Sequence, residues 1–167
     1  MKRISSIVAT IVCGLALAGS IGCDAAQAEN NEVKADAAKE AVWGSDFAKA
    51  QEAAKTSGKP ILAFFTGSDW CGWCIRLHKE VLGEKPFADY ASESLVLFEA
   101  DFPRGKKLDP EVAKQNDTLM EKYGVRGFPT LFLLSADGKV LGQTGYRPGG
   151  ADKYVEHLKE LIAAGNK

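Results

Sequence analysis

The chain contains a Cys-x-x-Cys motif, Cys71-Gly72-Trp73-Cys74, directly after a short apolar run and at the expected start of a helix. The apolar run, residues 60–65, has the length and composition of a strand that is buried on both faces. At a helix start, free backbone N–H groups and the positive end of the helix dipole favour the thiolate, which is the form that attacks disulfides. These residues therefore predict a strand–loop–helix unit that carries a reversible disulfide between Cys71 and Cys74.

Residues 1–22 have the pattern of a secretory signal peptide, because Lys2-Arg3 precede an apolar stretch that is too short to span a bilayer comfortably. Two cleavage sites fit. Ser20-Ile21-Gly22-Cys23 resembles a bacterial lipoprotein processing box, although Ser20 stands where leucine is usual. Ala26-Gln27-Ala28 is a small-x-small site for ordinary release. We favour the first site, with Cys23 as the lipidated residue, and expect an exported protein of the periplasm or cell envelope.

The cysteine count agrees with a redox role. Of the four cysteines, Cys13 leaves with the signal peptide, and Cys23 is either acylated or a leftover thiol. The folded part then contains the Cys71–Cys74 pair, whereas a small domain that is stabilised by disulfides would have more bridges that close longer loops. A bridge that encloses two residues stabilises a fold little, so redox chemistry explains the pair better than a structural disulfide does.

Composition divides the rest of the chain into a tether and one domain. Residues 23–42 are rich in Ala, Glu, Lys, Asp and Asn, which predicts a flexible tether, and residues 43–167 form the domain. Loss of Lys2 and Arg3 with the signal changes the formal net charge from −1 to −3. A nucleic-acid partner would need a basic surface, so we expect none.

The pattern of apolar residues predicts alternating helices and strands that end in a hairpin and a helix. Residues 102–115 contain Pro103 and Pro110 and predict mainly a surface loop, and Ser45 is the expected N-cap of the first helix. This order predicts an α/β fold, with a mixed central sheet covered by helices on both faces. The expected helices are 46–55, 71–82, 86–92, 116–123 and 151–163, and the expected strands are 60–65, 95–100, 130–134 and 140–143.

With these elements in order, the chain resembles the thioredoxin family over about residues 43–165. The resemblance rests on Trp70-Cys71-x-x-Cys74 after a buried strand, on the segment Tyr123-Gly124-Val125-Arg126-Gly127-Phe128-Pro129-Thr130, and on the hairpin–helix ending. In finer detail, residues 67–74 resemble small exported thioredoxin-like proteins of bacteria. The resemblance implies a thioredoxin-like fold and the activity of a thiol–disulfide oxidoreductase.

The resemblance also implies roles for individual residues. Cys71 is the expected nucleophile, partly exposed at the helix start, and Cys74 is the expected buried thiol that resolves the mixed disulfide. Pro129 is expected to be cis, so that an extended substrate can pair with the backbone beside Cys71. The residues expected to contact substrate are Trp70, Gly72, Trp73, Phe128 and Pro129, and packing of the active-site loop is an equal alternative for Trp70.

The chain departs from thioredoxin at positions that handle protons. The family usually buries an acid in the strand before the motif, and this chain has Phe64 or Phe65 there. The lysine that accompanies this acid is replaced by Leu97, and Trp73 stands where proline is common. Proton handling must therefore differ from that of thioredoxin.

Other polar residues near the motif are weaker candidates for a role in the chemistry of the two cysteines. His78 lies on the expected helix face of Cys74 and is a candidate proton acceptor or a half-buried packing residue. Asp69 is a candidate influence on the thiolate. We expect His157 and the Lys106-Lys107 loop to be solvated surface.

We expect no small-molecule cofactor and no metal. Zinc in proteins is usually bound by about four ligands, and His78 and His157 alone remain to join the two thiols. Ile75 follows the second cysteine, where a c-type haem site needs histidine.

Protein thiols and disulfides are the expected substrates of a monomer, and a membrane or envelope redox partner is expected to recycle the pair. The envelope is oxidising, so net reduction needs an electron donor and oxidation needs an acceptor, and the resemblance leans towards a reductase. A non-catalytic adaptor and a metal-carrying envelope protein remain alternatives.

Overall fold

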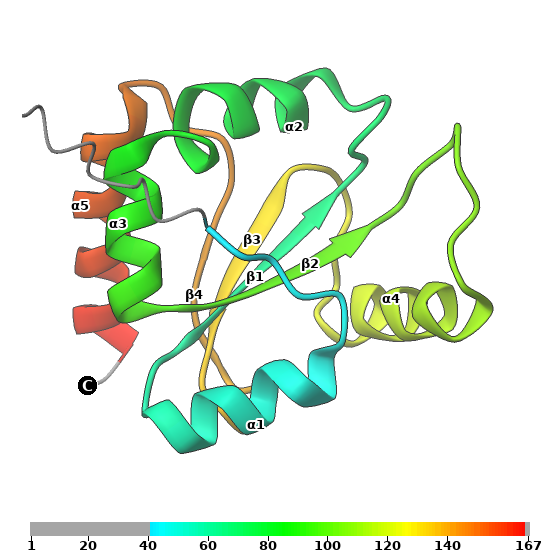
Figure 1. Ribbon diagram of the computed structural model, residues 1–167, viewed down its shortest axis with the longest axis horizontal. Helices are drawn as coiled ribbons and strands as arrows, with labels where there is room; N and C mark the ends of the chain where they lie inside the picture. The colour runs from blue at the N-terminus through cyan, green and yellow to red at the C-terminus, as the bar shows by residue number, and fades with distance from the viewer. Residues whose placement is uncertain (1–40, 166–167) are drawn as a thin grey trace, which may run out of the picture. The chain divides into compact units, whose positions relative to one another are not determined.

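The computed structural model describes residues 41–165. The predicted signal peptide, Cys23 and all but the last two residues of the predicted tether lie outside this range. The described part contains one four-stranded sheet, five α-helices and one π-helical turn (Figure 1). The helices are α1 (Phe47–Ser57), α2 (Gly72–Leu77), the π turn η1 (His78–Leu82), α3 (Lys85–Ser94), α4 (Pro110–Lys122) and α5 (Gly150–Gly165). The strands are β1 (Ile61–Thr66), β2 (Val96–Asp101), β3 (Thr130–Leu134) and β4 (Val140–Thr144).

The sheet is mixed, with the strand order β2-β1-β3-β4. β1 pairs in parallel with β2 and antiparallel with β3, and β3 pairs antiparallel with β4. The last two strands are joined by a tight turn in which Gly138 takes a φ of 80°, a left-handed conformation that glycine adopts without strain. Because β1 and β2 are parallel, their carboxyl ends meet at one edge of the sheet, and the loop to α2 starts there.

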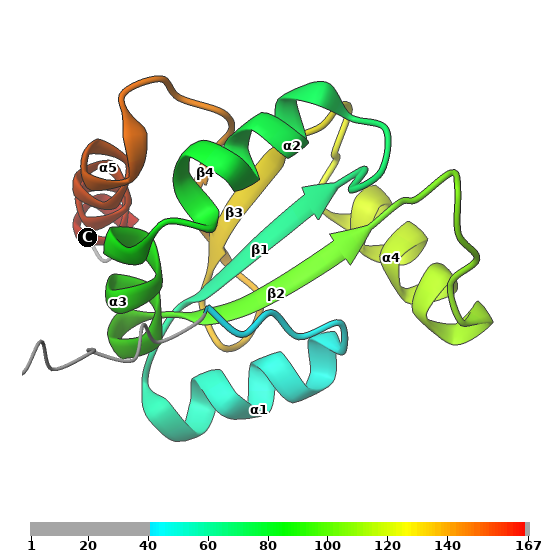
Figure 2. The same cartoon turned by 45° about the horizontal axis from the view of Figure 1, so that its top comes forward.

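Helices cover both faces of the sheet, and each face has its own apolar cluster (Figures 1 and 2). Side chains alternate along a strand, so Leu62 and Phe64 of β1 point to one face, and Ile61 and Phe65 point to the other. On the first face lie α2, η1, α3 and α5, and on the second lie α1 and α4. The prediction of a mixed sheet between two helical layers is confirmed, and β1 is buried along its whole length.

The segment before α1 is tied to the edge of β2. The Trp43 ring lies 5.7 Å from that of Phe64. Gly44 N–H donates to the Leu97 carbonyl at 3.0 Å, and Glu99 N–H donates to the Gly44 carbonyl at 2.9 Å. The chain is therefore anchored to the sheet before α1 begins.

Two helix starts differ from the sequence-based expectation. α1 is capped by Asp46 and not by Ser45, because the Asp46 carboxylate accepts from Lys49 N–H at 3.0 Å. α4 begins at Pro110 instead of residue 116, and Asp109 caps it by accepting from Glu111 N–H at 2.9 Å. Proline fits the first turn of a helix, where its missing N–H leaves no bond unmade, so Pro110 starts this helix and does not mark a loop.

The helix expected over residues 71–82 changes its geometry halfway. It is α-helical to Leu77, and η1 follows, with Gly83 N–H donating to the His78 carbonyl at 2.8 Å. A π turn has i→i+5 bonds, which shifts the phase of the side chains. Val81 and Leu82 are buried, whereas His78 is exposed, so the expectation of a half-buried packing residue is wrong for His78.

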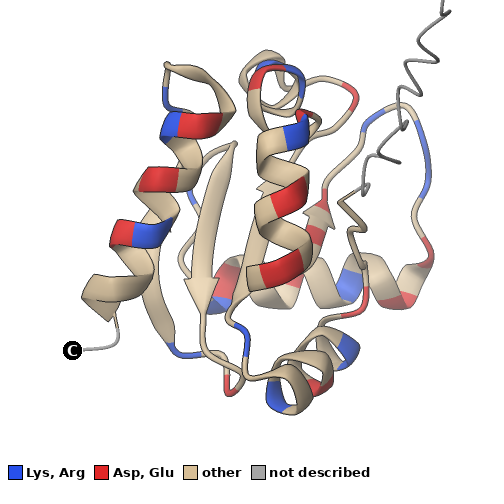
Figure 3. Cartoon of the chain, turned by 60° about the vertical axis from the view of Figure 1, so that its left-hand side comes forward, with Lys and Arg blue, Asp and Glu red and all other residues tan. Residues whose placement is uncertain are grey.

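Charged residues lie mainly on the helices and loops, and the strands are almost free of them (Figure 3). β1, β3 and β4 have none, and β2 carries Glu99 and Asp101. In residues 41–165, no helix combines the length and the apolar character that crossing a bilayer requires.

Phe65 tests the packing of the α1–α4 face. It is 0% exposed, and its ring lies 5.9 Å from that of Phe132. Phe65→Ala should lower the free energy of unfolding by about 3–5 kcal/mol, because it leaves a cavity in a closed cluster. The matched control is Val140→Ala at a residue that is 44% exposed, and it should change stability by less than about 0.5 kcal/mol. Urea denaturation measures both, and equal effects would contradict the packing described.

Candidate active site

Cys71 and Cys74 form a disulfide at the start of α2, with their Cα atoms 5.2 Å apart. Cys71 is the N-cap of α2, and Cys74 N–H donates to Cys71 Sγ at 3.3 Å. Cys71 is 7% exposed and Cys74 is 2% exposed, so Cys71 is more enclosed than the resemblance implies. The N–H group of the first turn points at the Cys71 sulfur, which favours the thiolate at this atom once the bridge is open.

Gly72 keeps one side of the disulfide open. It is exposed, and a Cβ placed on it would meet no heavy atom within 4 Å. A substrate chain therefore has room to approach beside Cys71.

The loop before Cys71 is fixed by the end of β2. Ser68 donates to the Asp101 carboxylate from its backbone N–H at 2.9 Å and from its hydroxyl at 2.7 Å. The Lys106 ammonium lies 2.9 Å from the same carboxylate. Burial alone raises the pKa of Asp101, but the Ser68 hydrogen bonds and the Lys106 charge outweigh it and hold the pKa below its usual range. Lys106 is thus an ion-pair partner, which corrects the expectation of a merely solvated lysine.

Trp70 is held by two contacts with the loop that follows β2. Its indole N–H donates to the Phe102 carbonyl at 2.7 Å, and the Arg104 guanidinium lies 3.8 Å from its ring centroid. The neighbouring Asp69 carboxylate accepts from the backbone N–H groups of Arg104, at 3.0 Å, and Gly105. These two donors lower the pKa of Asp69. The carboxylate of Asp69 is thus engaged by this loop, and its contacts give it a structural role.

The Phe128–Pro129 peptide bond is cis. The Phe128 ring lies 5.9 Å from Trp70, edge to face, and stacks on Phe102 with ring centroids 5.1 Å apart. The contact between Trp70 and Phe128 joins the residue before Cys71 to the residue before Pro129. The cis bond and the disulfide loop therefore share one aromatic wall.

Trp73 lies between the two cysteines and is 56% exposed. Its ring is 5.1 Å from Tyr146, and the Arg76 guanidinium lies over both rings, at 5.6 Å and 5.2 Å. Glu80 accepts from Arg76 Nε and from the Tyr146 hydroxyl, both at 2.7 Å. This group of side chains holds Trp73 at the surface beside the disulfide.

Sequence reasoning missed Phe102, Arg104 and Tyr146. A signal for Phe102 was available, because it follows β2 as the loop to Cys71 follows β1, and parallel strands end at the same edge. Arg104 and Tyr146 depend on loop conformations that no local pattern encodes.

His157, expected on the solvated surface, is half-buried. Its Nε2 lies 3.0 Å from the Thr144 hydroxyl, and burial lowers its pKa. It lies on α5 and does not belong to the site.

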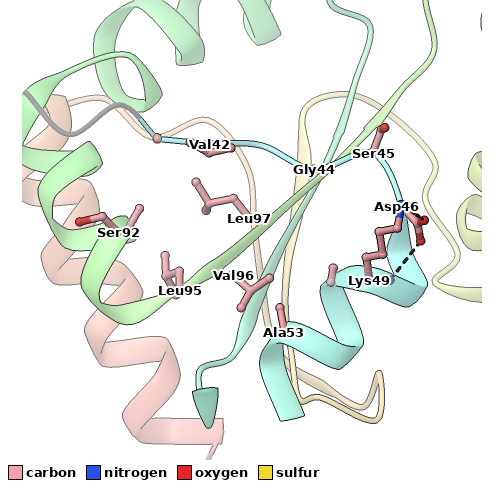
Figure 4. Close-up of a pocket in the computed structure, with 13 residues that line it drawn as sticks. Val42, Gly44, Ser45, Asp46, Lys49, Ala53, Ser92, Leu95, Val96 and Leu97 are labelled. Atoms are coloured by element: carbon pink, nitrogen blue, oxygen red, sulfur yellow. Dashed lines mark hydrogen bonds and ion pairs between the residues drawn. The ribbon is translucent and has the colours of Figure 1, made fainter. Parts of the chain in front are cut away.

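A cavity of about 510 Å³ lies beside β2 and α1, and none of its lining residues belongs to the cysteine motif (Figure 4). Within residues 41–165, no three His, Cys, Asp or Glu side chains are grouped to hold a metal ion.

Asp101→Asn tests whether this carboxylate holds the loop. It should cost about 1–3 kcal/mol of unfolding free energy at pH 7, because charge-assisted hydrogen bonds to Ser68 and Lys106 weaken. A depressed folded pKa stabilises above the unfolded value of about 3.9 and is lost as the pH falls through the folded pKa. The difference from the parent should therefore shrink between about pH 5 and pH 3. Urea denaturation across this range measures it, with Asp137→Asn at an exposed position as the control.

The model of the Thioredoxin-like domain family matches residues 47–161. Disulfide bond reductase DsbH of Chlamydia pneumoniae is 40% identical over 120 residues, which are 72% of this chain and 72% of that protein. The thioredoxin-related protein DsbJ of the same organism is 29% identical over 104 residues, which are 62% of this chain and 30% of that protein.

A solved structure of a DsbH oxidoreductase has a TM-score of 0.73 at 38% identity, and the match covers 76% of this chain and 88% of that chain. The residues matched by the family model include the cysteine motif, the cis-proline segment and most of α5. The chain belongs to the thioredoxin-like family.

Proposed function

We propose that this protein is an exported thiol–disulfide oxidoreductase that reduces disulfides of protein substrates with the Cys71–Cys74 pair. The observation that carries the proposal is the Cys74 N–H donated to Cys71 Sγ at the first turn of α2. Membership of the thioredoxin-like family and 40% identity to a disulfide bond reductase support the oxidoreductase activity.

The reaction has two exchange steps. The Cys71 thiolate attacks one sulfur of a substrate disulfide, forms a mixed disulfide and expels the other substrate sulfur as a thiolate. Cys74 loses its proton and attacks Cys71 Sγ, which breaks the mixed disulfide and frees the second substrate sulfur. The substrate gains the two electrons that the Cys71–Cys74 dithiol loses, and solvent protons neutralise the two product thiolates.

The substrate surface combines the open side of Gly72 with the aromatic groups around it. Trp70 and Phe128 form one wall, Pro129 follows Phe128 through the cis bond, and the exposed Trp73 lies next to Gly72. A flat aromatic surface beside exposed backbone suits an extended peptide that carries a disulfide.

The reductase relative supports the direction of the reaction, and the amino-terminal sequence supports the location. A reductase in an oxidising compartment needs a redox partner in the membrane or envelope that returns electrons to the oxidised pair. The signal peptide and Cys23 as a lipid anchor would place the domain there, and they remain predictions outside the described residues. The protein would act as a monomer, without a small-molecule cofactor and without nucleic acid.

The first test is turnover. Cys71→Ser should abolish the protein's catalysis of insulin disulfide reduction by dithiothreitol, because the attacking sulfur is gone. Cys74→Ser should leave the first attack intact and accumulate substrate as a mixed disulfide on Cys71, detected by non-reducing electrophoresis and mass spectrometry. Insulin precipitation at the same rate with the parent and with Cys71→Ser would reject the enzyme and favour an adaptor.

Trp73 tests the substrate surface. Trp73→Ala should raise KM for a disulfide-bearing peptide about tenfold, or about 1.4 kcal/mol, because a large aromatic contact is lost. The rate with a small aromatic disulfide should change little. Ile75→Ala is the matched control, since Ile75 is 50% exposed on the same helix. An unchanged KM for the peptide would remove Trp73 from the substrate surface.

A further inference from the structure

Glu99 is a half-buried acid on the edge strand β2, on the face of the sheet that α2 covers. Its neighbour two positions before it, Leu97, packs in the same cluster as Cys74, and its register partner on β1, Phe64, belongs to that cluster too. Because alternate residues of a strand share a face, the Glu99 carboxylate is directed to the side of the sheet on which Cys74 lies.

A cavity connects the two residues. It has a volume of about 380 Å³, enough for several water molecules. Cys74 and Glu99 both line it, and the other lining residues are Thr66, Ser68, Ile75, His78 and Lys79. The buried thiol therefore has a route to water, and Glu99 lies on the wall of that route.

The Glu99 carboxylate is available for a proton. Among residues 41–165 it has no hydrogen-bond or ion-pair partner, whereas Asp101 is engaged by Ser68 and Lys106. Burial raises the pKa of Glu99, the negative charge of Asp101 raises it further, and the Lys106 charge lowers it. A carboxylate in this position takes up a proton more readily than an exposed one.

We infer that Glu99 accepts the proton that Cys74 must lose before it attacks the mixed disulfide, through water in the shared cavity. The inference rests on the proposed function, because it assigns a proton path to the second step of that reaction. It supplies an acceptor where Phe64 and Phe65 leave β1 without an acid.

The step balances. A proton moves from Cys74 Sγ through water to the Glu99 carboxylate, and the Cys74 thiolate attacks Cys71 Sγ. The Cys71–Cys74 bond forms, the bond from Cys71 to the substrate sulfur breaks, and that sulfur leaves as a thiolate. The Glu99 carboxyl group then returns its proton to solvent through the cavity.

His78 lines the same cavity but fits the role less well. It is exposed, and its ring leans towards the end of η1, since a Cβ on Gly83 would lie 3.6 Å from two imidazole atoms. The other charged groups that face Glu99 are Asp101 at the end of β2, Lys106 in the loop that follows β2, and Lys79 on η1. β1 contributes Thr66 and Phe64, which carry no charge.

The test is the rate of the second step in Glu99→Gln, measured by rapid mixing with a disulfide peptide between about pH 6 and pH 10. At pH 6–7 the rate should fall at least about tenfold, since a general base contributes at least this much. The two rates should converge towards pH 9–10, where an ordinary thiol ionises without help. Glu121→Gln, at an exposed residue of α4, is the control and should match the parent.

Three further measurements separate a proton role from a structural one. Glu99→Asp should recover part of the rate, because it keeps a carboxylate, and Glu99→Gln should not lower the melting temperature, because it removes an unpaired, half-buried charge. In the Cys74→Ser background, Glu99→Gln should leave the rate of the first attack unchanged. A missing first attack in this background would contradict the proposed function, and it would not report on the role of Glu99. His78→Gln should not reproduce the pH-dependent loss.

A parent-like second step in Glu99→Gln at all pH values would overturn the inference. So would an equal loss at every pH, or a loss reproduced by His78→Gln. If Glu99→Gln fails to fold, Glu99→Asp decides, because a shorter carboxylate must still give the parent's pH profile at a reduced rate.

Discussion

Burial of β1 on both faces is the constraint on which the site depends. A strand with helices above and below it cannot shift its register, because a slip of one residue would exchange Phe64 and Phe65 between the two clusters. The end of β1 is therefore fixed, and with it the loop that presents Cys71. The parallel partner β2 ends beside it and contributes Asp101, which holds Ser68 in that loop.

Long-range contacts refine a site whose centre is local. The Cys74 N–H and the Cys71 sulfur meet because they lie in one turn of helix. The aromatic wall, in contrast, joins three loops through Trp70, Phe102 and Phe128. The centre determines which atom reacts, and the wall determines what can lie beside it.

The sequence predicts the elements of the fold and the local centre of the site well, and it predicts the long-range contacts around the site poorly. The succession of helices and strands follows from apolar runs such as residues 60–65 and from the hairpin turn, and the disulfide follows from the spacing of Cys71 and Cys74. The π turn at His78 and the start of α4 at Pro110 were missed, because both depend on hydrogen-bond choices that similar residues make in more than one way. Glu99 was missed because its neighbours across the sheet, and not along the chain, give it its importance.

The hold on Trp70 affects the thermodynamics of substrate docking. A hydrogen bond to Phe102 and the stacked Arg104 leave the indole little rotational freedom before any partner arrives. A preorganised side chain loses less conformational entropy on association, so the same contact area yields more net affinity. The wall is thus selective through its rigidity, and a disulfide whose flanking chain does not match the shape of the wall gains little from it.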